Sequence, residues 1–530
     1  MMWAMAGPEL YFTAVAGLFF VLAMRKRVSP ARDYTTALLA SAAGVAVTLL
    51  ALRLEGSLFF DAYRVDHFSQ VFKAVIAVGL LLVVWLCKEM DLPGGQHPEF
   101  YFLLVTCSLG MMFIVSSVEL LTLYVSLELT SYSLYVLVPL RRGRRSEVGG
   151  RRTEIRGRRS EVGDQRSEDG DRRSEGGGRR TEDGDQRSEV GGRRSEVGDR
   201  EADGMLQAEA GIKYFLIGAT VSTIMLFGLA LLFGATRTTY IAGLVHSLPE
   251  AIGTPMGFVG LLFTLSGLFF KLAFFPFHVW GPTVYQAASN QTTTFIATTT
   301  KVMAIAVVTR IVASTGGSEH LAQVLLALSI VSMTFGNLAA LVQKDIKRLL
   351  AYSAIAHAGY VLIGILSMTS QGYAGALFYA IAYMTMTFIC FLVVLKVSEG
   401  GRNVEISGLA GLHRRSPLLA MALMVGIFSL GGIPPTVGFT GKFLVFTAAM
   451  EKGHFVLVLV AMANVAVSLY YYIQIIRAAY LLEPDAALPR IPLSFSGRAL
   501  TLVLVIFVFF GGVFPGYLYE VAVKAAGVLP

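Results

Sequence analysis

Charged residues are scarce in this sequence for its length. Asp, Glu, Lys and Arg make up 15% of the 530 residues, whereas hydrophobic residues make up 55%. Soluble globular domains average about 25% charged residues, so the composition excludes an ordinary soluble protein of this size. The hydrophobic residues also come in blocks of about twenty, the length that crosses the hydrocarbon core of a bilayer. The sequence therefore predicts a polytopic integral membrane protein.

Cysteine is also rare. The chain has three, Cys87, Cys107 and Cys390, which lie far apart within apolar segments. No pair of them has the spacing of a metal site or a redox motif, so we interpret all three as small apolar residues. The formal net charge of +8 does not indicate nucleic-acid binding, because in a membrane protein the informative feature is how Lys and Arg are distributed between loops.

The apolar blocks predict an all-α integral membrane protein with about fourteen transmembrane helices. The first block precedes the basic cluster at residues 25–27. This order is the reverse of that in a cleaved signal peptide, so the block is predicted to be a membrane helix. The expected spans lie near residues 8–24, 35–54, 67–87, 99–117, 118–139, 210–233, 256–276, 284–311, 320–342, 349–368, 373–397, 417–450, 454–480 and 498–520.

Basic residues predict the orientation of these helices, because Lys and Arg prefer cytoplasmic loops. They gather in alternate loops of this chain, and few fall in the loops between. This pattern fits an even number of spans with both termini outside. The basic loops, predicted to be inside, contain residues 25–27, 88, 141–203, 344–348, 402–415 and 490–498.

Residues 141–203 differ from the rest of the chain. From Gly143 onward the heptad GRRSEVG recurs eight times with variations. Of the chain's 44 Lys and Arg and 36 Asp and Glu, 18 Arg and 16 acidic residues lie here. Almost no heptad position is apolar, which excludes a coiled coil and predicts a cytoplasmic segment that is disordered or transiently helical. It could contact a neighbouring subunit or anionic headgroups, or it could be a duplicated loop that is merely tolerated.

Four charged residues lie inside apolar segments, where lipid disfavours them: Glu128, Lys271, Lys301 and Lys442. A charge at the bilayer centre costs at least ~2.5–3.5 kcal/mol, so such residues usually face the bundle interior and have a function there. A Lys near a helix end can instead extend to the interface, an alternative that is weakest for Lys271 and Lys301. Lysines and a carboxylate that shift one another's protonation are suited to carrying protons.

Three further residues are candidates with stronger structural alternatives. Lys213 lies near the predicted inner end of its helix, where its ammonium group could reach the interface. His278 and His357 have side chains that exchange protons near neutral pH. Either histidine could also be a hydrogen-bonded residue in helix packing.

Proline and glycine interrupt two of the predicted helices beside a lysine. Pro276 follows Lys271 by five residues, and the sequence GGIPP at residues 431–435 precedes Lys442. Proline removes a helix hydrogen bond, and freed backbone groups must face protein or water rather than lipid. A hydrated half-channel would use such a break; a packing kink is the alternative. By the predicted orientation the two broken helices run in opposite directions, which is typical of inverted repeats.

These segments resemble the antiporter-like membrane subunits of the proton-pumping NADH:quinone oxidoreductase, respiratory complex I, and among them the subunit N family. The resemblance covers nearly the whole chain except residues 141–203. The matching segments are EAGIKYFLIGA, FKLAFFPFHVWGPTVYQ, the Lys301 helix, KRLLAYSAIAHAGY and GGIPPTVGFTGKF.

The resemblance implies four parts. Residues 1–98 would form N-terminal transmembrane helices, residues 99–311 the first antiporter-like half with 141–203 as its cytoplasmic insertion, residues 320–480 the second, inverted half, and residues 481–530 a C-terminal loop and the last helix. The family usually has proline after VYQ, whereas this chain continues AASNQTTTFIATTTK. We expect the geometry before Lys301 to be affected by this departure.

The resemblance also implies a role for each candidate. Glu128 is expected to be the acidic partner on the fifth helix, modulating the charge of Lys271 on the broken seventh helix. Lys301 is expected to be the relay lysine on the eighth helix, and Lys442 the terminal lysine beside the exit to the outside. Lys213 and His357 match positions on the polar axis that connects them.

The function implied is that of a proton-translocating membrane subunit driven by quinone reduction elsewhere in the complex. No cofactor or redox centre is expected in this chain, and quinone and NADH would be used by the whole complex. The expected partners are other membrane subunits and the lipid bilayer, with no nucleic acid, and the expected location is a bacterial inner membrane. One rival is a subunit of a multi-subunit cation/proton antiporter. Another is a structural membrane subunit whose charges only hold helices together.

Overall fold

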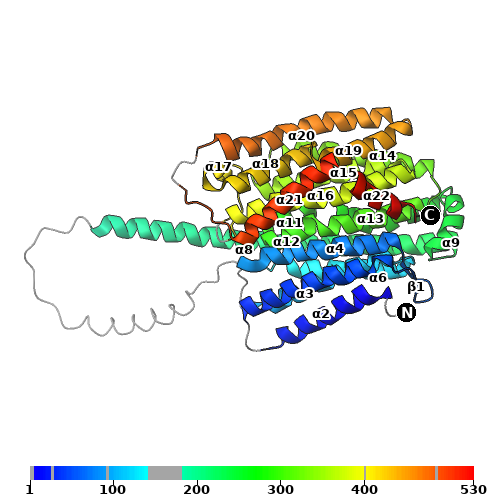
Figure 1. Ribbon diagram of the computed structural model, residues 1–530, viewed down its shortest axis with the longest axis horizontal. Helices are drawn as coiled ribbons and strands as arrows, with labels where there is room; N and C mark the ends of the chain where they lie inside the picture. The colour runs from blue at the N-terminus through cyan, green and yellow to red at the C-terminus, as the bar shows by residue number, and fades with distance from the viewer. Residues whose placement is uncertain are drawn as a thin grey trace, which may run out of the picture.

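The computed structural model describes residues 5–25, 29–90, 95–140, 182–398, 401–483 and 488–529, with the backbone alone for Glu89 and residues 182–203. Long helices form a bundle (Figure 1). The N-terminal part contains α2 (Gly7–Ala23), α3 (Pro30–Leu50), α4 (His67–Leu86), α5 (His97–Ser116) and α6 (Leu120–Leu137). The middle part contains α8 (Glu182–Thr236), α9 (Ile241–Ala251), α10 (Pro255–Leu272), α11 (Trp280–Ala287), α12 (Asn290–Ala297) and α13 (Thr299–Ala313).

The C-terminal part contains α14 (Glu319–Ala340), α15 (Ile346–Leu366), α16 (Ser370–Val397), α17 (Leu412–Arg415), α18 (Pro417–Gly431), α19 (Val437–Glu451), α20 (Phe455–Leu481), α21 (Phe495–Val513) and α22 (Gly516–Ala526). Short 3-10 turns are η1 (Ala51–Arg53), η2 (Cys87–Glu89) and η5 (Ser407–Leu409). An antiparallel hairpin of β1 (Gly56–Leu58) and β2 (Tyr63–Val65) connects η1 to α4.

The membrane spans follow the hydrophobic blocks. Within the described residues, 12 helical segments are long and apolar enough to cross a bilayer, and α2 and α18 are shorter apolar helices. With α19, which continues α18 beyond a break, these elements account for each of the spans expected from the sequence. The prediction of an all-α membrane protein with about fourteen spans is confirmed.

Two predicted boundaries are wrong. The span expected at 284–311 begins at Asn290, because Trp280–Ala287 forms α11, the second part of the preceding broken helix. The side chain of Ser289 accepts a hydrogen bond from the backbone N–H of Thr292 and so caps the start of α12. The last span, expected at 498–520, ends at Val513, before Pro515, which cannot continue a helix.

The repeat segment is described only in part. Residues 141–181 lie outside the described residues. Residues 182–203, expected to be disordered or transiently helical, form the first turns of α8 instead. Helix α8 continues without interruption to Thr236, because no proline lies between Glu182 and Thr236. Figure 1 shows this part of α8 projecting well beyond the end of the bundle.

The two broken helices end their first parts in the same way. In α10 the C-cap residue Ala273 is left-handed (φ 58°), and in α18 Gly432 is left-handed (φ 78°). The next residue in each case donates a hydrogen bond to a carbonyl five residues back, Phe274 N to Phe269 O and Ile433 N to Phe428 O. This is the Schellman pattern of helix C-termini. Each break also contains a cis X-Pro bond, at Pro276 and at Pro435.

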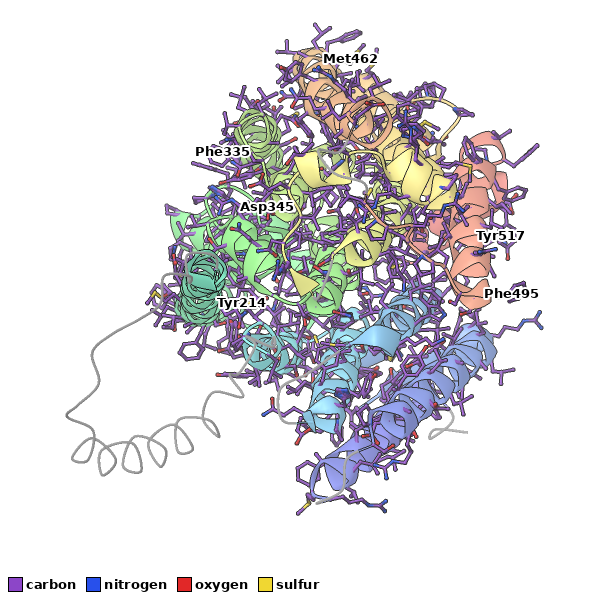
Figure 2. All side chains as sticks on the ribbon, turned by 90° about the vertical axis from the view of Figure 1, so that its left-hand side faces the viewer. Tyr214, Phe335, Asp345, Met462, Phe495 and Tyr517 are labelled. Carbon is purple, nitrogen blue, oxygen red and sulfur yellow. The ribbon has the colours of Figure 1, made fainter. Side chains whose placement is uncertain are left out.

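The centre of the bundle consists of α12–α13, α15 and α16. The apolar segments of α12–α13 and α16 are buried throughout, and that of α15 nearly so. Figure 2 views the helices end-on, with α8 (Tyr214) and α22 (Tyr517) on opposite flanks and α20 (Met462) at the top. Both chain termini, the hairpin and α9 lie at one end of the bundle, opposite the projecting part of α8 (Figure 1).

Candidate functional site

Lys271 lies on the last turn of α10, just before the first break. Its residue is 2% exposed, and its Nζ atom has no hydrogen-bond partner among the described residues. The ammonium group lies over two aromatic rings, 5.8 Å from the centre of Tyr214 and 5.9 Å from that of Phe270. Cation–π contacts of this kind stabilise a desolvated cation but leave its donor atoms available for water or another side chain.

Lys301 reaches the same break from α13. It is 2% exposed, and its Nζ donates a 2.6 Å hydrogen bond to the carbonyl oxygen of Leu272, the residue that follows Lys271. That carbonyl belongs to the C-terminus of α10, where a helix carries a partial negative charge that favours a cation. The first break therefore places the Lys301 ammonium group beside the residue that follows Lys271.

A small cavity joins Lys301 to the second half of the chain. Its volume is about 10 Å³, and Lys301, His357 and Tyr383 contribute the polar side chains of its lining. This is roughly the room that one water molecule needs. His357 is buried in the middle of α15, with Nδ1 2.7 Å from the Tyr379 hydroxyl and Nε2 3.1 Å from the Tyr472 hydroxyl.

Lys442 lies at the second break, on α19. It is 4% exposed, and its Nζ donates to two carbonyls at the end of α18, Leu430 O at 2.9 Å and Gly431 O at 3.2 Å. It also lies over the ring of Tyr360, 4.8 Å from its centre. The ring of Tyr360 packs edge-on against His357, with 5.8 Å between the ring centres.

These contacts make one buried row of titratable side chains. Lys271 and Lys301 meet at the first break, the small cavity lies between Lys301 and His357, and Tyr360 lies between His357 and Lys442. The row runs through the centre of the bundle from one broken helix to the other. Charged groups in such a row influence one another's protonation, and the small cavity has room for one water between Lys301 and His357.

The other three predicted residues lie outside this row. Glu128 is half-buried on α6 and accepts a 2.5 Å hydrogen bond from the hydroxyl of Ser222 on α8, rather than pairing with Lys271. Lys213 forms an ion pair with Glu209, four residues before it, and its side chain is 44% exposed. His278 lies in the first break and stacks on Phe275, with 5.3 Å between the ring centres.

Sequence reasoning missed two buried ion pairs in the N-terminal helices. Lys73 Nζ on α4 lies 2.7 Å from Glu9 Oε1 on α2, and both side chains are almost fully buried. Arg310, at the end of α13, donates from Nη2 to both carboxylate oxygens of Asp66, at 2.9 and 2.7 Å. The partners are 64 and 244 residues apart in the sequence, so no local pattern indicates either pair.

Asp66 precedes α4 and is the N-cap of that helix. Its carboxylate accepts a hydrogen bond from the backbone N–H of Ser69, and the Ser69 hydroxyl accepts one in return from the backbone N–H of Asp66. Burial alone would raise the pKa of the Asp66 carboxyl, but the Arg310 guanidinium and the hydrogen bonds from Ser69 outweigh burial and lower it. Asp66 therefore stays ionised at neutral pH and acts as an anchor.

Comparisons with known proteins agree with this architecture. Residues 201–468 match the family model described as NADH:quinone oxidoreductase/Mrp antiporter, TM. The chain is 48% identical, over the full length of both, to NADH-quinone oxidoreductase subunit N 2 of Syntrophobacter fumaroxidans. It is 39% identical to the protein of the same name from Opitutus terrae, covering 96% of this chain and 95% of that one.

Solved structures show the same fold. A chain of respiratory complex I from Thermus thermophilus superposes with a TM-score of 0.74 at 29% identity, covering 98% of this chain and 99% of that one. A chain of the Mrp complex from Dietzia has a TM-score of 0.79 at 19% identity, covering 100% and 98%. The fold and its row of buried lysines define an antiporter-like membrane subunit. Within that class, the chain belongs to the family of NADH-quinone oxidoreductase subunit N.

Proposed function

We propose that this chain is a proton-translocating membrane subunit of an NADH-quinone oxidoreductase. The observation that carries the proposal is the continuous buried row from Lys271 through Lys301 and His357 to Lys442. A cation inside a membrane protein is costly, and buried lysines at two helix breaks have a direct use as proton carriers. The relatives named NADH-quinone oxidoreductase subunit N support the proposal that this chain is part of a redox complex.

Each residue has a distinct proposed task. Lys271, whose ammonium has no fixed hydrogen bond, exchanges protons most readily and receives the electrostatic signal. Lys301 passes the proton across the small cavity to His357, and Lys442 receives it at the second break. Glu128, held by Ser222, acts on Lys271 through its charge and draws the proton toward Lys271 when its hydrogen bond to Ser222 opens.

Lys213 and His278 have secondary tasks in this proposal. Lys213 lies at the surface of α8, where its pair with Glu209 can respond to a neighbouring subunit. His278 lies within the first break, where backbone groups freed from the helix must face protein or water rather than lipid. Neither belongs to the central row, so substituting either one should lower the rate of proton movement without abolishing it.

The energy needed to move a proton against the membrane potential is comparable with the interaction energy of two neighbouring charges. Moving one charge against a membrane potential costs ~2.3 kcal/mol per 100 mV. Two unit charges about 6 Å apart at an effective dielectric constant of about 20 interact by roughly 3 kcal/mol. A change of charge at one end of the row can therefore alter the protonation of the next member by enough to move a proton.

The other parts of the proposal concern the assembly. We propose two inverted halves, residues 99–311 and 320–480, each containing one broken helix, with residues 1–98 and 481–530 as additions. Redox energy would reach the row through neighbouring membrane subunits, with quinone and NADH used by the whole complex and no redox centre in this chain. The complex would lie in the bacterial inner membrane with both termini on the periplasmic side.

The test is proton pumping in inverted membrane vesicles, with quinone reduction followed in parallel, for Lys271→Ala. We expect proton pumping to be lost while the complex stays assembled, because the row loses its first carrier. Lys452→Ala, which removes an exposed lysine in the turn before α20, is the matched control and should pump like the unmodified complex. Full pumping by Lys271→Ala would refute the proposal.

A second candidate function is that of a subunit of a multi-subunit cation/proton antiporter. The structural match to the Mrp complex favours it only at the level of the fold. The same vesicles separate the two functions. If Lys271→Ala leaves quinone reduction unchanged and removes sodium-dependent proton exchange, the antiporter function is the correct one.

A further inference from the structure

A large cavity opens at the end of the bundle that carries both termini. Its volume is about 650 Å³, and its lining includes the hairpin, the turn before α9 and Val528, which follows α22. Charged side chains from the hairpin side reach into it, among them Arg64 and Asp61, and its lining also includes the ion pair of Asp66 and Arg310. The cavity lies next to the first half and the N-terminal helices, away from Lys442.

The Asp66–Arg310 pair holds three helices together at this cavity. Asp66 caps α4, Arg310 ends α13, and Arg310 Nη1 also donates a 2.9 Å hydrogen bond to the carbonyl of Val115 on α5. The guanidinium packs 4.3 Å from the ring centre of Phe68. All the hydrogen bonds are well formed, so this pair fixes the position of the helix ends rather than exchanging protons.

Below the cavity, α4 presents a polar face. Asp66, Gln70 and Lys73 are spaced by four and three residues, which places them above one another on one side of a helix. Gln70 is fully buried, and neither its Nε2 nor its Oε1 has a hydrogen-bond partner among the described residues. Buried amide groups are nearly always satisfied by protein or ordered water, so this side chain indicates a hydrated place.

Lys73 and Glu9 form the next step inward. Lys73 Nζ and Glu9 Oε1 lie 2.7 Å apart as an ion pair. Lys73 Nζ has no aligned hydrogen bond, and the other carboxylate oxygen, Glu9 Oε2, also has no hydrogen-bond partner within the described residues. Tyr63, on the hairpin, donates a 2.5 Å hydrogen bond to Glu9 Oε1. The charged groups that act on Lys73 are Glu9 from α2, Asp66 from the start of α4 and Arg310 from α13.

On the side of α4 opposite Gln70, this helix also contacts α13. A Cβ atom at Gly79 would lie 2.4 Å from Thr299 Oγ1, so the two helices touch there. Thr299 Oγ1 is buried and has no hydrogen-bond partner among the described residues. It follows the break between α12 and α13 and precedes Lys301 by two residues.

We propose that the polar face of α4 formed by Asp66, Gln70 and Lys73 is a second, outward proton path, with Glu9 and Lys73 as its proton-exchanging pair and the 650 Å³ cavity as its mouth. The path rests on the proposed function, since the protons that it releases are those that the buried row takes up. It gives the first half its own connection to the outside, besides the row that leads to Lys442.

The proton balance of the step is simple. A proton that arrives at the Lys73 amine makes the ammonium form. The ammonium passes one proton to the Glu9 carboxylate, which becomes the neutral acid while Lys73 returns to the amine. Glu9 then releases that proton to water beside Gln70, which carries it past Asp66 into the cavity. Tyr63 is a positioning residue, because its hydroxyl holds the Glu9 carboxylate toward Lys73.

The alternative is that Glu9 and Lys73 only hold α2 against α4. Removing one partner of a buried pair leaves an uncompensated charge, whereas removing both with groups of similar size is often neutral or stabilising. A structural pair and a proton-exchanging pair therefore predict different behaviour for the double variant, in which no buried charge is left over.

The first test measures water access in the assembled complex. Cys87, Cys107 and Cys390 are replaced by serine, and single cysteines are introduced as Gln70→Cys and, for the control, Ile76→Cys. Both positions are fully buried on α4, but Ile76 is apolar and lies off the polar face. A charged, membrane-impermeant thiol reagent added from the periplasmic side should label Gln70→Cys and leave Ile76→Cys unlabelled. Equal labelling, or none at either site, would overturn the path.

The second test measures pumping in inverted vesicles for Lys73→Met, Lys73→Arg and the double variant Glu9→Gln/Lys73→Met. We expect pumping to fall in Lys73→Met and to stay low in the double variant even though the complex assembles, with quinone reduction slowed because it is coupled. Lys73→Arg should assemble normally and also pump poorly, because an arginine does not release its proton. Recovery of full pumping in the double variant would show a structural pair and refute the path.

The two proposals fail in different ways. If Lys271→Ala stops pumping and the double variant pumps normally, the outward path is wrong and the proposed function holds. If Lys271→Ala pumps normally, the proposed function is wrong, and labelling at Gln70→Cys would then report a hydrated cavity without proton transport. That last outcome also overturns the path.

Discussion

Three buried lysines of this chain bind the C-terminal ends of interrupted helices. Lys301 donates to Leu272 O at the end of α10, and Lys442 donates to Leu430 O and Gly431 O at the end of α18. Lys347 donates a 2.9 Å hydrogen bond to Ala288 O at the end of α11. A helix C-terminus carries about half a negative charge. These ends therefore stabilise ammonium groups inside the bundle without a carboxylate, and Lys301 and Lys442 are each both a cap and a candidate carrier.

The two tasks of Lys301 can be separated by substitution. Lys301→Gln keeps a neutral N–H donor, on a side chain one bond shorter, but has no proton to give up, whereas Lys301→Leu removes the donor as well. We expect both variants to lose proton pumping in vesicles. Only Lys301→Leu should also lower the thermal midpoint of the purified complex, since an unsatisfied buried carbonyl costs ~1–3 kcal/mol. Normal pumping by Lys301→Gln would mean that Lys301 is a cap alone.

Asp66 gives a prediction for acid stability. Its folded-state pKa lies below the ordinary value of 3.8, so the carboxylate contributes stability that is fully present above that value and is lost as the pH falls through the folded pKa. Asp66→Asn, which leaves Arg310 buried without its partner, should cost ~3–5 kcal/mol at neutral pH. The difference in the free energy of unfolding between Asp66→Asn and the unmodified complex should stay constant down to about pH 5. It should become smaller only below about pH 4.

Denaturation midpoints of the complex measured across this pH range provide the check. Arg64→Gln is the matched control, because Arg64 lies 3.8 Å from the same carboxylate but its side chain is 57% exposed. Exposed pairs contribute at most ~1 kcal/mol, so this variant should be close to the unmodified complex. A difference for Asp66→Asn that already narrows near pH 6 would show that the carboxyl group binds a proton in the physiological range.

The sequence predicts the charged residues that stand out from their surroundings. Lys271 and Lys301 are recognisable because apolar residues flank them on both sides, and the structure buries both. Lys73 and Glu9 cannot be recognised in this way, because each lies within two turns of a helix start, where a charged side chain can reach water. Their burial depends on helices that come together only in the folded bundle. For the same reason the sequence does not show that Glu128 bonds to Ser222.

At the scale of elements, the two breaks share one backbone pattern but use different residues for it. A non-glycine residue in the left-handed region costs roughly 1–2 kcal/mol, and glycine adopts it without that cost. The first break has Ala273 at this position and the second has Gly432. The sequence predicts the second break clearly because GGIPP contains the required glycine, and it predicts the first less well because Ala273 looks like a helix residue.

This difference predicts opposite effects for reciprocal substitutions. Gly432→Ala should lower the thermal midpoint of the complex, because it adds left-handed strain and a Cβ atom 2.9 Å from Lys442 Cδ. It should also reduce pumping, since Lys442 would have to move. Ala273→Gly removes strain at the matching position and should leave the midpoint unchanged or raise it, with normal pumping. Equal loss in both variants would mean that packing, rather than the left-handed conformation, decides the geometry of the breaks.

The start of the span that contains Lys301 depends partly on a contact that the sequence does not reveal. Residues 284–311 are predicted as one span because no proline or glycine separates α11 from α12, although residues 289–294 are all polar. The turn at Ala288 and Ser289 is made by the cap of Ser289 and by Lys347, which binds Ala288 O. The cap is a local signal that could have been used. The lysine comes from α15 and could not have been foreseen.

At the scale of the molecule, the positions of the basic repeat and of the cavity predict how the bundle is oriented in the membrane. The termini, the hairpin and the 650 Å³ cavity share one end of the bundle, and the Arg-rich repeat joins the other through α8. Because basic loops stay in the cytoplasm, the end with the cavity is predicted to face the periplasm. The proposed outward path then leads protons in the direction that a respiratory pump needs.

Cysteine labelling of vesicles tests this orientation directly. With the three native cysteines replaced by serine, Phe60→Cys in the hairpin and Phe495→Cys at the start of α21 report on opposite ends, because these side chains are 95% and 89% exposed. In inverted vesicles a membrane-impermeant reagent should label Phe495→Cys and not Phe60→Cys, and in right-side-out vesicles the reverse. Labelling of both sites after detergent treatment controls for shielding by neighbouring subunits. The opposite pattern would place the cavity in the cytoplasm, and the α4 path would then be an entrance for protons rather than an exit.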